Sequence, residues 1–359
     1  MAFTKVFSYF FIKFNLFIFL FFSQVTTASA NAAHEPFMWG LVGYHIPFDT
    51  YKLTEDDIKT IADNGVEWIS INFAWRDIEP VRNAEFKFDY FDMVMSAAKA
   101  NGLKVFAQVG NGYNSPLVRS SVPNWTIELN TLAYVRELED YATAVVQRYG
   151  ADIDYWALEN EINFARVHIV AMWRVGRWPD YKNDEIMRTL SRVVRVHDPD
   201  SRIVLSATPM FPGTFGRWLE RVADIIDYDI VGLHLYPSFN PTKEGYIKKF
   251  YEFSNEAIRV ASRSSGGKPI LIMETGFHAS SDLVGDYKNT EENQSKYIEM
   301  MSKFALDNNL MGVFIYEYLD GPEERLSREQ NFGVMRQDRT PKPAWGVYGD
   351  IIKANTFDY

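Results

Sequence analysis

Glutamates at the ends of two apolar runs are the residues whose chemistry stands out in this sequence. The run YWALENEINF (155–164) ends with Glu159 and Glu161 on either side of Asn160, and ILIMETG (270–276) ends with Glu274. Burying a carboxylate costs several kcal/mol unless it is paired or protonated, so these positions need an explanation. Two facing carboxylates, one protonated and one ionised, are what cleavage of a glycosidic bond requires.

Short apolar runs alternate with segments of helical periodicity along the chain beyond residue 31. The eight strand candidates are MWGLVGY (38–44), WISINF (68–73), KVFAQV (104–109), YWALENE (155–161), RIVLSA (202–207), IVGLHLY (230–236), ILIMETG (270–276) and GVFIYEY (312–318). Parallel strands covered by helices read as nearly continuous apolar runs, and eight βα units close into a barrel. An open doubly wound sheet is the alternative, but GLVGYHIPF lacks the G-x-G-x-x-G spacing of a phosphate-binding turn. The sequence therefore predicts one α/β domain, a (β/α)8 TIM barrel, over residues 31–359.

Helix boundary signals agree with this alternation. Thr54 is placed to cap the segment TEDDIKTIADN, whose first turn is acidic. Gly65 and Gly102 follow their helices as C-terminal stops, and Pro343 opens the last helix.

Polar and aromatic side chains cluster at the predicted C-terminal strand ends, where barrels carry their chemistry. These residues are Tyr44, His45, Asn72, Trp75, Gln108, Asn111, Asn160, Glu161, His234, Tyr236, Glu274, Tyr316 and Glu317. Glu161 and Glu274 end the fourth and seventh strands, which a closed barrel brings across the mouth from each other. We therefore expect them to face each other at about 5 to 5.5 Å, the separation of a retaining glycosidase.

Several motifs, in their order on successive strands, carry a resemblance to a known group of enzymes. ALENE ends the fourth strand, HLY the sixth and METG the seventh; WRDIEPVRNAEFKFDYFD follows the second strand and NFGVMRQDRTPKPAW closes the barrel. Together they resemble the retaining glycoside hydrolases of clan A, particularly families 39 and 5, over nearly the whole mature chain. The resemblance implies a glycosidase that cleaves β-glycosidic bonds of a polysaccharide or oligosaccharide by double displacement, with no cofactor.

Residue roles follow from this resemblance. Glu161 is implied to be the acid/base, Asn160 the contact to the sugar 2-hydroxyl, and Glu274 the nucleophile. His234 and Tyr236 match the polar residues of the clan's sixth strand, with Tyr236 the expected hydrogen-bond partner of the nucleophile. The chain departs from the clan at two positions: Ser70 stands where an arginine usually holds the nucleophile ionised, and Tyr316 replaces the tryptophan that floors the sugar site.

Further residues are candidates for substrate contacts. His45 and Asn111 lie at strand ends, and the tryptophans of the presumed βα loops offer indole faces for stacking on a pyranose: Trp75, Trp125, Trp173 and Trp178. Arg174 and Arg177 hint at an acidic sugar. We expect Glu159 to have a structural role, Glu79 to be a loop contact, and Glu317 to point away from the mouth.

Other functions remain as alternatives. A barrel metallohydrolase needs clustered ligands, but the six histidines include no His-x-His pair, and we expect no metal. A catalytically disabled carbohydrate-binding barrel and a transglycosylase on the same scaffold stay open. The sequence also leaves open the sugar, with glucan, xylan, mannan, galactan or an exopolysaccharide as candidates, and endo or exo attack.

The N-terminal residues read as a signal peptide. Lys5 and Lys13 precede the apolar run LFIFLFF, and Ala28-Ser29-Ala30 has the small-residue pattern of a cleavage site. We therefore expect residues 1–30 to be removed and the protein to be secreted or periplasmic, with an uncleaved anchor as the alternative. Cleavage removes two lysines and no acids, which takes the formal charge from −10 to −12. Such an acidic chain is not expected to bind nucleic acid, and we expect a monomer without a membrane span after cleavage.

Overall fold

The computed structural model describes residues 36–44, 52–110, 121–163, 180–237, 244–280, 289–321 and 329–356. A compact unit extends over Phe37–Tyr359. The predicted signal peptide, residues 1–30, lies outside the described residues, so its assignment stays a prediction.

A closed barrel of parallel strands forms the centre of this unit. Each strand is hydrogen-bonded to the next, and β8 is bonded to β1. The strands are β1 (Met38–Tyr44), β2 (Trp68–Asn72), β3 (Lys104–Val109), β4 (Ile153–Leu158), β5 (Arg202–Ala207), β6 (Ile230–His234), β7 (Ile270–Thr275) and β8 (Gly312–Ile315). The predicted (β/α)8 fold is confirmed.

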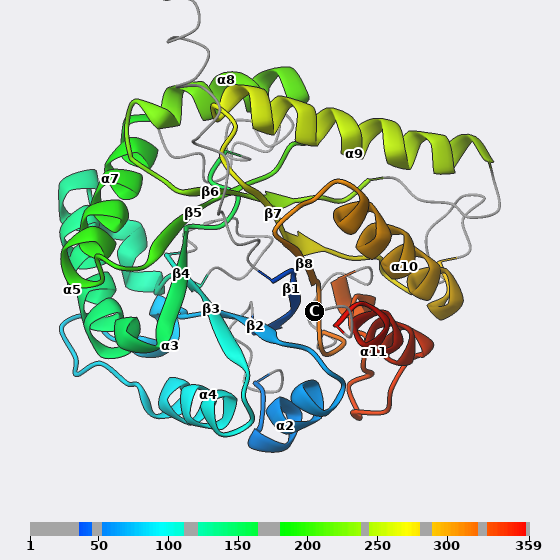
Figure 1. Ribbon diagram of the computed structural model, residues 1–359. Helices are drawn as coiled ribbons and strands as arrows, with labels where there is room; N and C mark the ends of the chain where they lie inside the picture. Colours follow the sequence, from blue (N-terminus) through cyan, green and yellow to red (C-terminus); the bar gives the residue numbers. More distant parts are fainter. Residues whose placement is uncertain are drawn as a thin grey trace, which may run out of the picture. The chain divides into compact units, whose positions relative to one another are not determined.

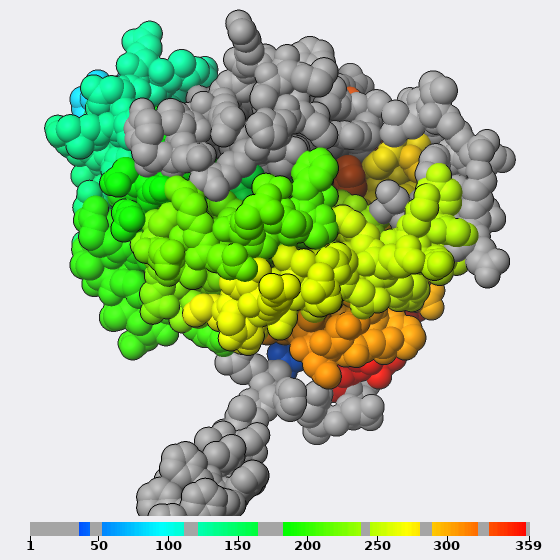
Figure 2. All heavy atoms as spheres, turned by 90° about the horizontal axis from the view of Figure 1, so that it is seen from above, coloured from blue at the N-terminus to red at the C-terminus, as the bar shows by residue number. Residues whose placement is uncertain are grey.

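Helices surround the strands when the barrel is viewed along its axis (Figure 1). They are α2 (Glu55–Asp63), α3 (Trp75–Ile78), α4 (Asp89–Ala100), α5 (Thr131–Tyr149), α7 (Asp180–His197), α8 (Pro212–Ala223), α9 (Glu244–Ser264), α10 (Glu291–Asp307) and α11 (Pro343–Thr356). Short 3-10 turns are η2 (Asn124–Glu128), η3 (Gly150–Asp152) and η5 (Glu329–Asn331). Figure 2 shows α8 and α9 side by side on the outside of the barrel. Within the described ranges, no helix is long and apolar enough to cross a membrane.

The predicted helix boundaries are confirmed, because the caps and backbone angles that define them depend on residues close in sequence. Thr54 and Asp57 form a reciprocal capping box at the start of α2. Gly65 and Gly102 follow α2 and α4 with φ of 89° and 72°, a conformation that glycine adopts without steric cost. Pro343 is the first residue of α11.

Strand ends were predicted less well than strand starts. The fourth strand was expected to run to Glu161 but ends at Leu158, because Glu159 and Glu161 have left-handed backbone conformations with φ of 59° and 45°. The second, sixth, seventh and eighth strands also stop one to three residues before the predicted end, at Asn72, His234, Thr275 and Ile315 respectively. Asn160, Glu161, Tyr236 and Tyr316 therefore belong to the turns that leave the barrel, while Asn72, His234 and Glu274 remain in their strands.

The apolar residues of the strands divide between two layers. Residues of one face pack against the helices around the barrel. Residues of the other face fill the barrel interior; the strand residues among them are Met38, Val42, Trp68, Phe106, Tyr155, Ala157, Val204, Ile230, Leu271, Met273 and Phe314. Phe106 and Phe314 meet across the interior with ring centroids 5.0 Å apart. Side chains alternate along a strand, so the next inward positions toward the C-terminal ends lie above this apolar layer.

Candidate active site at the carboxyl ends of the strands

His234, the last residue of β6, lies between the two predicted catalytic glutamates. Its Nδ1 is 3.2 Å from Oε2 of Glu274 on β7 and 3.6 Å from Oε1 of Glu161 in the turn after β4. These contacts limit the separation of the two carboxylate oxygens to at most the sum of 3.2 and 3.6 Å. The structure therefore brings the two glutamates together at the same end of the barrel, as the strand order predicted.

Glu274 is held by side chains at the end of β6 and just after it. The Tyr236 hydroxyl donates a hydrogen bond of 2.6 Å to Glu274 Oε1, the contact that the sequence predicted for this tyrosine. Burial and the neighbouring carboxylate of Glu274 raise the pKa of Tyr236 well above its ordinary value. The phenol consequently stays protonated and acts as a donor throughout the range in which a carboxylate ionises.

His234 is a basic side chain beside the same carboxylate. Burial by itself lowers the pKa of His234, but the carboxylate of Glu274, and then that of Glu161, outweighs burial and raises the pKa above its ordinary value. Ser70, on the inner face of β2, is too short and uncharged to do this. When protonated, His234 places beside Glu274 a positive charge of the kind that the resemblance assigns to an arginine on strand two.

Ser206 on β5 connects the acid/base candidate to the histidine. The Glu161 backbone N–H donates to Ser206 Oγ at 3.2 Å, and the same hydroxyl lies 3.0 Å from His234 Nε2. Sequence reasoning missed Ser206; its signal is the inward position near the end of β5, in line with Val204.

The turn that carries Glu161 is held in an uncommon backbone conformation. Glu159 and Glu161 both have positive φ, which costs on the order of 1–3 kcal/mol per non-glycine residue and is concentrated at functional sites. Gln108 on β3 holds the turn, because its Nε2 donates to Glu159 O at 2.8 Å and to Asn160 Oδ1 at 3.1 Å.

Glu159 lies away from the other two glutamates. Its Oε1 is close to Gly110. Its carboxylate interacts electrostatically with Lys182 on α7 and Tyr134 on α5, which lie outside the barrel. Burial lowers the pKa of Lys182 to about 8, while the Glu159 carboxylate opposes this shift. The position fits the structural role predicted for Glu159.

The stacking role predicted for Trp75 is wrong. Trp75 is 0 % exposed on the inward face of α3, its Nε1 donates to Glu79 Oε2 at 2.9 Å, and its ring stacks on Tyr141. The chain turns into α3 directly after β2, and this turn packs the indole under α5. Glu79 also accepts from Asn83 N, which makes it a loop contact as expected.

Three aromatic rings form the wall beside Glu274. Tyr316, which follows β8, lies with its ring centroid 6.5 Å from that of Tyr236 and 5.3 Å from that of Phe332. Phe332 comes from the closing motif NFGVM, in which no role was predicted for this residue. Whether Tyr316 floors the sugar site stays a prediction.

Other predicted contacts lie outside the described residues: His45, Asn111, Trp173, Arg174, Arg177 and Trp178. Trp125 is described and partly buried, with its Nε1 donating to Glu79 O. In the part of the chain that the structure covers, no group of three or more His, Asp or Glu side chains is arranged to hold a metal ion.

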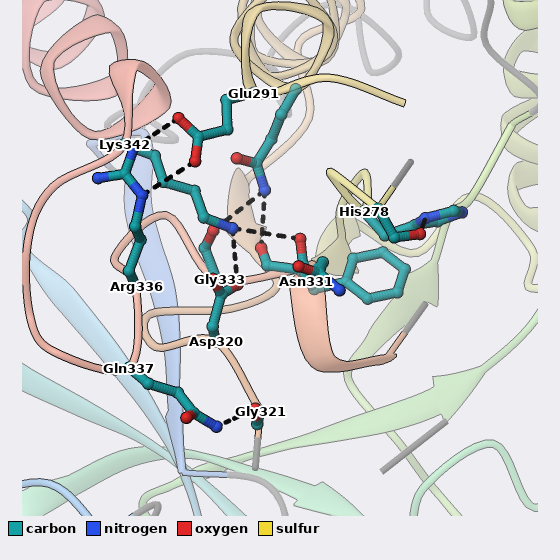
Figure 3. Close-up of polar contacts among 12 residues, drawn as sticks. His278, Glu291, Asp320, Gly321, Asn331, Gly333, Arg336, Gln337 and Lys342 are labelled. Atoms are coloured by element: carbon teal, nitrogen blue, oxygen red, sulfur yellow. Dashed lines mark hydrogen bonds and ion pairs between the residues drawn. The ribbon is translucent and has the colours of Figure 1, made fainter. Parts of the chain in front are cut away.

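A polar hollow of about 320 Å³ has Glu291, Asp320, Asn331, Arg336 and Lys342 among its lining residues, and Figure 3 shows the polar contacts around it. Lys342 contacts Asp320 at 2.6 Å and Arg336 contacts Glu291 at 2.7 Å, so these charges compensate each other. Lys342 also donates to the Asn331 carbonyl at 3.4 Å. These pairs join the segment around Phe332 to α10 and to the end of β8.

The closed parallel barrel, with two carboxylates from β4 and β7 at the carboxyl ends of its strands, defines the (β/α)8 glycoside hydrolase class. The sequence matches the model of glycosyl hydrolase family 53 over residues 48–318, so the chain belongs to that family of clan A. The clan is the one the motifs indicated, although the matching family is 53 rather than 39 or 5.

Individual relatives are more distant. A 6-phospho-beta-glucosidase of Clostridium longisporum is 27% identical over 139 residues, which are 38% of this chain and 28% of the relative. A family 39 glycoside hydrolase from Bacteroides cellulosilyticus WH2 has a TM-score of 0.62 at 18% identity, covering 88% of this chain and 64% of that one. A GH5_18 protein from Streptomyces cattleya, solved in complex with GlcNAc, has a TM-score of 0.68 at 16% identity, covering 90% and 81% of the two chains. At such identities the two structures show the fold alone.

Proposed function

We propose that this protein is a secreted retaining glycosidase that cleaves β-glycosidic bonds by double displacement, with Glu274 as nucleophile and Glu161 as acid/base. The observation that carries the proposal is the convergence of the two carboxylates on His234 Nδ1, at 3.2 and 3.6 Å.

The environments of the two glutamates support different roles. Glu274 has an 11 % exposed side chain, and the Tyr236 hydroxyl donates to it, which favours its ionised form; His234 Nδ1 lies 3.2 Å from it. The Glu161 side chain is 26 % exposed, so it can exchange protons with water. A nucleophile must be ionised, whereas an acid/base must gain and lose a proton in each turnover.

The proposed reaction has two steps. The Glu274 carboxylate attacks the anomeric carbon and forms a glycosyl ester, while the glycosidic C–O bond breaks and Glu161 gives its proton to the leaving oxygen. Glu161 then takes a proton from water, whose oxygen attacks the anomeric carbon and releases Glu274 as a carboxylate. Two inversions give retention of configuration.

The contacts of the two carboxylates with His234 allow the separation found in retaining enzymes. Inverting enzymes leave about 6.5–9.5 Å between the carboxyl groups for a water molecule, while retaining enzymes leave about 5–5.5 Å. The upper limit set through His234 lies near the bottom of the inverting range.

The names of two curated relatives bear on the class of substrate. The chain spans about a quarter of the length of its curated relatives, whose names are 6-phospho-beta-glucosidase and beta-glucosidase. We propose a β-linked oligosaccharide or polysaccharide as the substrate, reached after export directed by residues 1–30.

Covalent trapping tests the function. A panel of 2-deoxy-2-fluoro glycosyl fluorides, with gluco, galacto, manno and xylo configurations, should add the mass of one glycosyl group to a peptide that contains Glu274. A carbohydrate-binding barrel would gain no mass with any member of the panel. Product analysis with added acceptor sugars then separates hydrolysis from transglycosylation.

A further inference from the structure

Gln108 makes two hydrogen bonds whose polarity is fixed by chemistry. It lies on the inner face of β3, is 2 % exposed, and contacts Glu159 O and Asn160 Oδ1 through one atom, its amide nitrogen. A backbone carbonyl only accepts hydrogen bonds, so the atom of Gln108 that faces Glu159 O must be the NH₂ group and not the amide oxygen.

The orientation of Gln108 determines that of Asn160. An NH₂ group has two hydrogens and no acceptor site, so the Asn160 atom beside it, 3.1 Å away, must be the amide oxygen. A reversed Asn160 amide would place two NH₂ groups against each other. The Asn160 NH₂ group is therefore the part of this side chain left for a ligand.

We infer that Gln108 is a positioning residue that makes Asn160 a hydrogen-bond donor toward the substrate's 2-hydroxyl group. This inference rests on the proposed function and adds a residue to which the sequence motifs assign no role. A hydroxyl group has one proton. With Asn160 donating to its oxygen, that proton is free to be given to the Glu274 carboxylate.

Gln108 also fixes the backbone of the same turn. Its bond to Glu159 O joins β3 to the first of the two left-handed residues that surround Asn160. One buried side chain thus holds both the path of the turn and the orientation of the amide within it.

A comparison of 2-hydroxy and 2-deoxy substrates tests the inference. The substrates are the aryl β-glycoside on which the wild type is most active and its 2-deoxy analogue. The variant is Gln108→Met, which keeps the length of the side chain and removes the donor. The ratio of variant to wild-type kcat/KM is compared between the substrates, which cancels their different intrinsic reactivities.

We expect Gln108→Met to lose at least about tenfold in kcat/KM on the 2-hydroxy substrate but less than about threefold on the 2-deoxy analogue, since contacts to the 2-hydroxyl strengthen in the transition state. Gln294→Met is the matched control, because Gln294 is also buried and donates from its Nε2 to backbone carbonyls, those of Phe277, Phe332 and Gly333. Its effect should be the same on both substrates.

Equal losses on the two substrates, or no loss on either, would overturn the inference. Should Gln108→Met fail to fold, Asn160→Asp carries the test, because it keeps an acceptor for Gln108 and removes the outward donor. That variant is expected to show the same dependence on the 2-hydroxyl, and a uniform loss would again refute the assignment. A wild type without glycosidase activity would overturn the proposed function as well, whereas uniform losses in an active enzyme refute this inference alone.

Discussion

Replacing Tyr236 by Phe removes the hydroxyl that donates to Glu274 and leaves the aromatic ring in place. The hydrogen bond is 2.6 Å long and its acceptor is a carboxylate with an 11 % exposed side chain. A hydrogen bond to a charged group contributes roughly 1.5–3 kcal/mol, and one pKa unit corresponds to about 1.36 kcal/mol. The Glu274 carboxylate should therefore have a pKa about one to two units higher in the variant.

The sign of this shift determines the pH dependence. The tyrosine stabilises the ionised nucleophile, so its loss favours the protonated, inactive form. Activity that falls as the pH is lowered should fall earlier, and the acid limb of the kcat/KM profile should move to higher pH by about one to two units. The assay is hydrolysis of an activated aryl glycoside across the pH range in which the wild type is folded.

Tyr318→Phe is the matched control. The Tyr318 hydroxyl also donates to a buried carboxylate, at 3.1 Å to Asp57 Oδ1, but that carboxylate belongs to the cap of α2. This variant should lose stability and keep the position of the acid limb. An acid limb that is unchanged in Tyr236→Phe, or displaced equally in both variants, would refute the assignment of Glu274 as the ionised nucleophile.

Three further experiments address the catalytic pair, the α2 cap and export. Glu161→Ala should retain activity toward aryl glycosides with good leaving groups and give a glycosyl azide of retained configuration with added azide, while Glu274→Ala should give the inverted azide; the same anomer from both contradicts the roles. Asp57→Ala should lower the free energy of unfolding at pH 7 by about 2–4 kcal/mol, through loss of the capping box and the bidentate contact to Arg339. Burial alone would raise the pKa of Asp57, but the hydrogen bonds from Arg339 and Thr54 hold this pKa below its ordinary value. The stability difference between wild type and variant should therefore shrink as the pH falls through that lowered pKa. An equal thermal unfolding midpoint for the two proteins at pH 7 would contradict this prediction. Finally, intact-mass measurement of exported protein should give a chain that begins at Asn31, and retention of the preceding residues would indicate an anchor.

Local patterns in the sequence were sufficient to predict the barrel. The strand runs are apolar on both faces because one face packs on the interior layer and the other on the helices, and that requirement is visible residue by residue. Helix ends such as those at Thr54 and Gly65 were predictable for the same reason: their hydrogen bonds and backbone angles depend on near neighbours. The strand order also determined that Glu161 and Glu274 would lie on the same end of the barrel.

Only the tertiary structure decided which side chains act together there. His234 lies beside Glu274 because a register shift after Leu233 pairs the two residues across β6 and β7, and a short apolar run carries no signal for such a shift. The left-handed turn at Glu159 and Glu161 depends on Gln108, some fifty residues earlier in the chain. Trp75 shows the opposite case: its loop position predicted exposure, but packing against α5 buried it, because a side chain's exposure depends on neighbours that the local sequence does not contain.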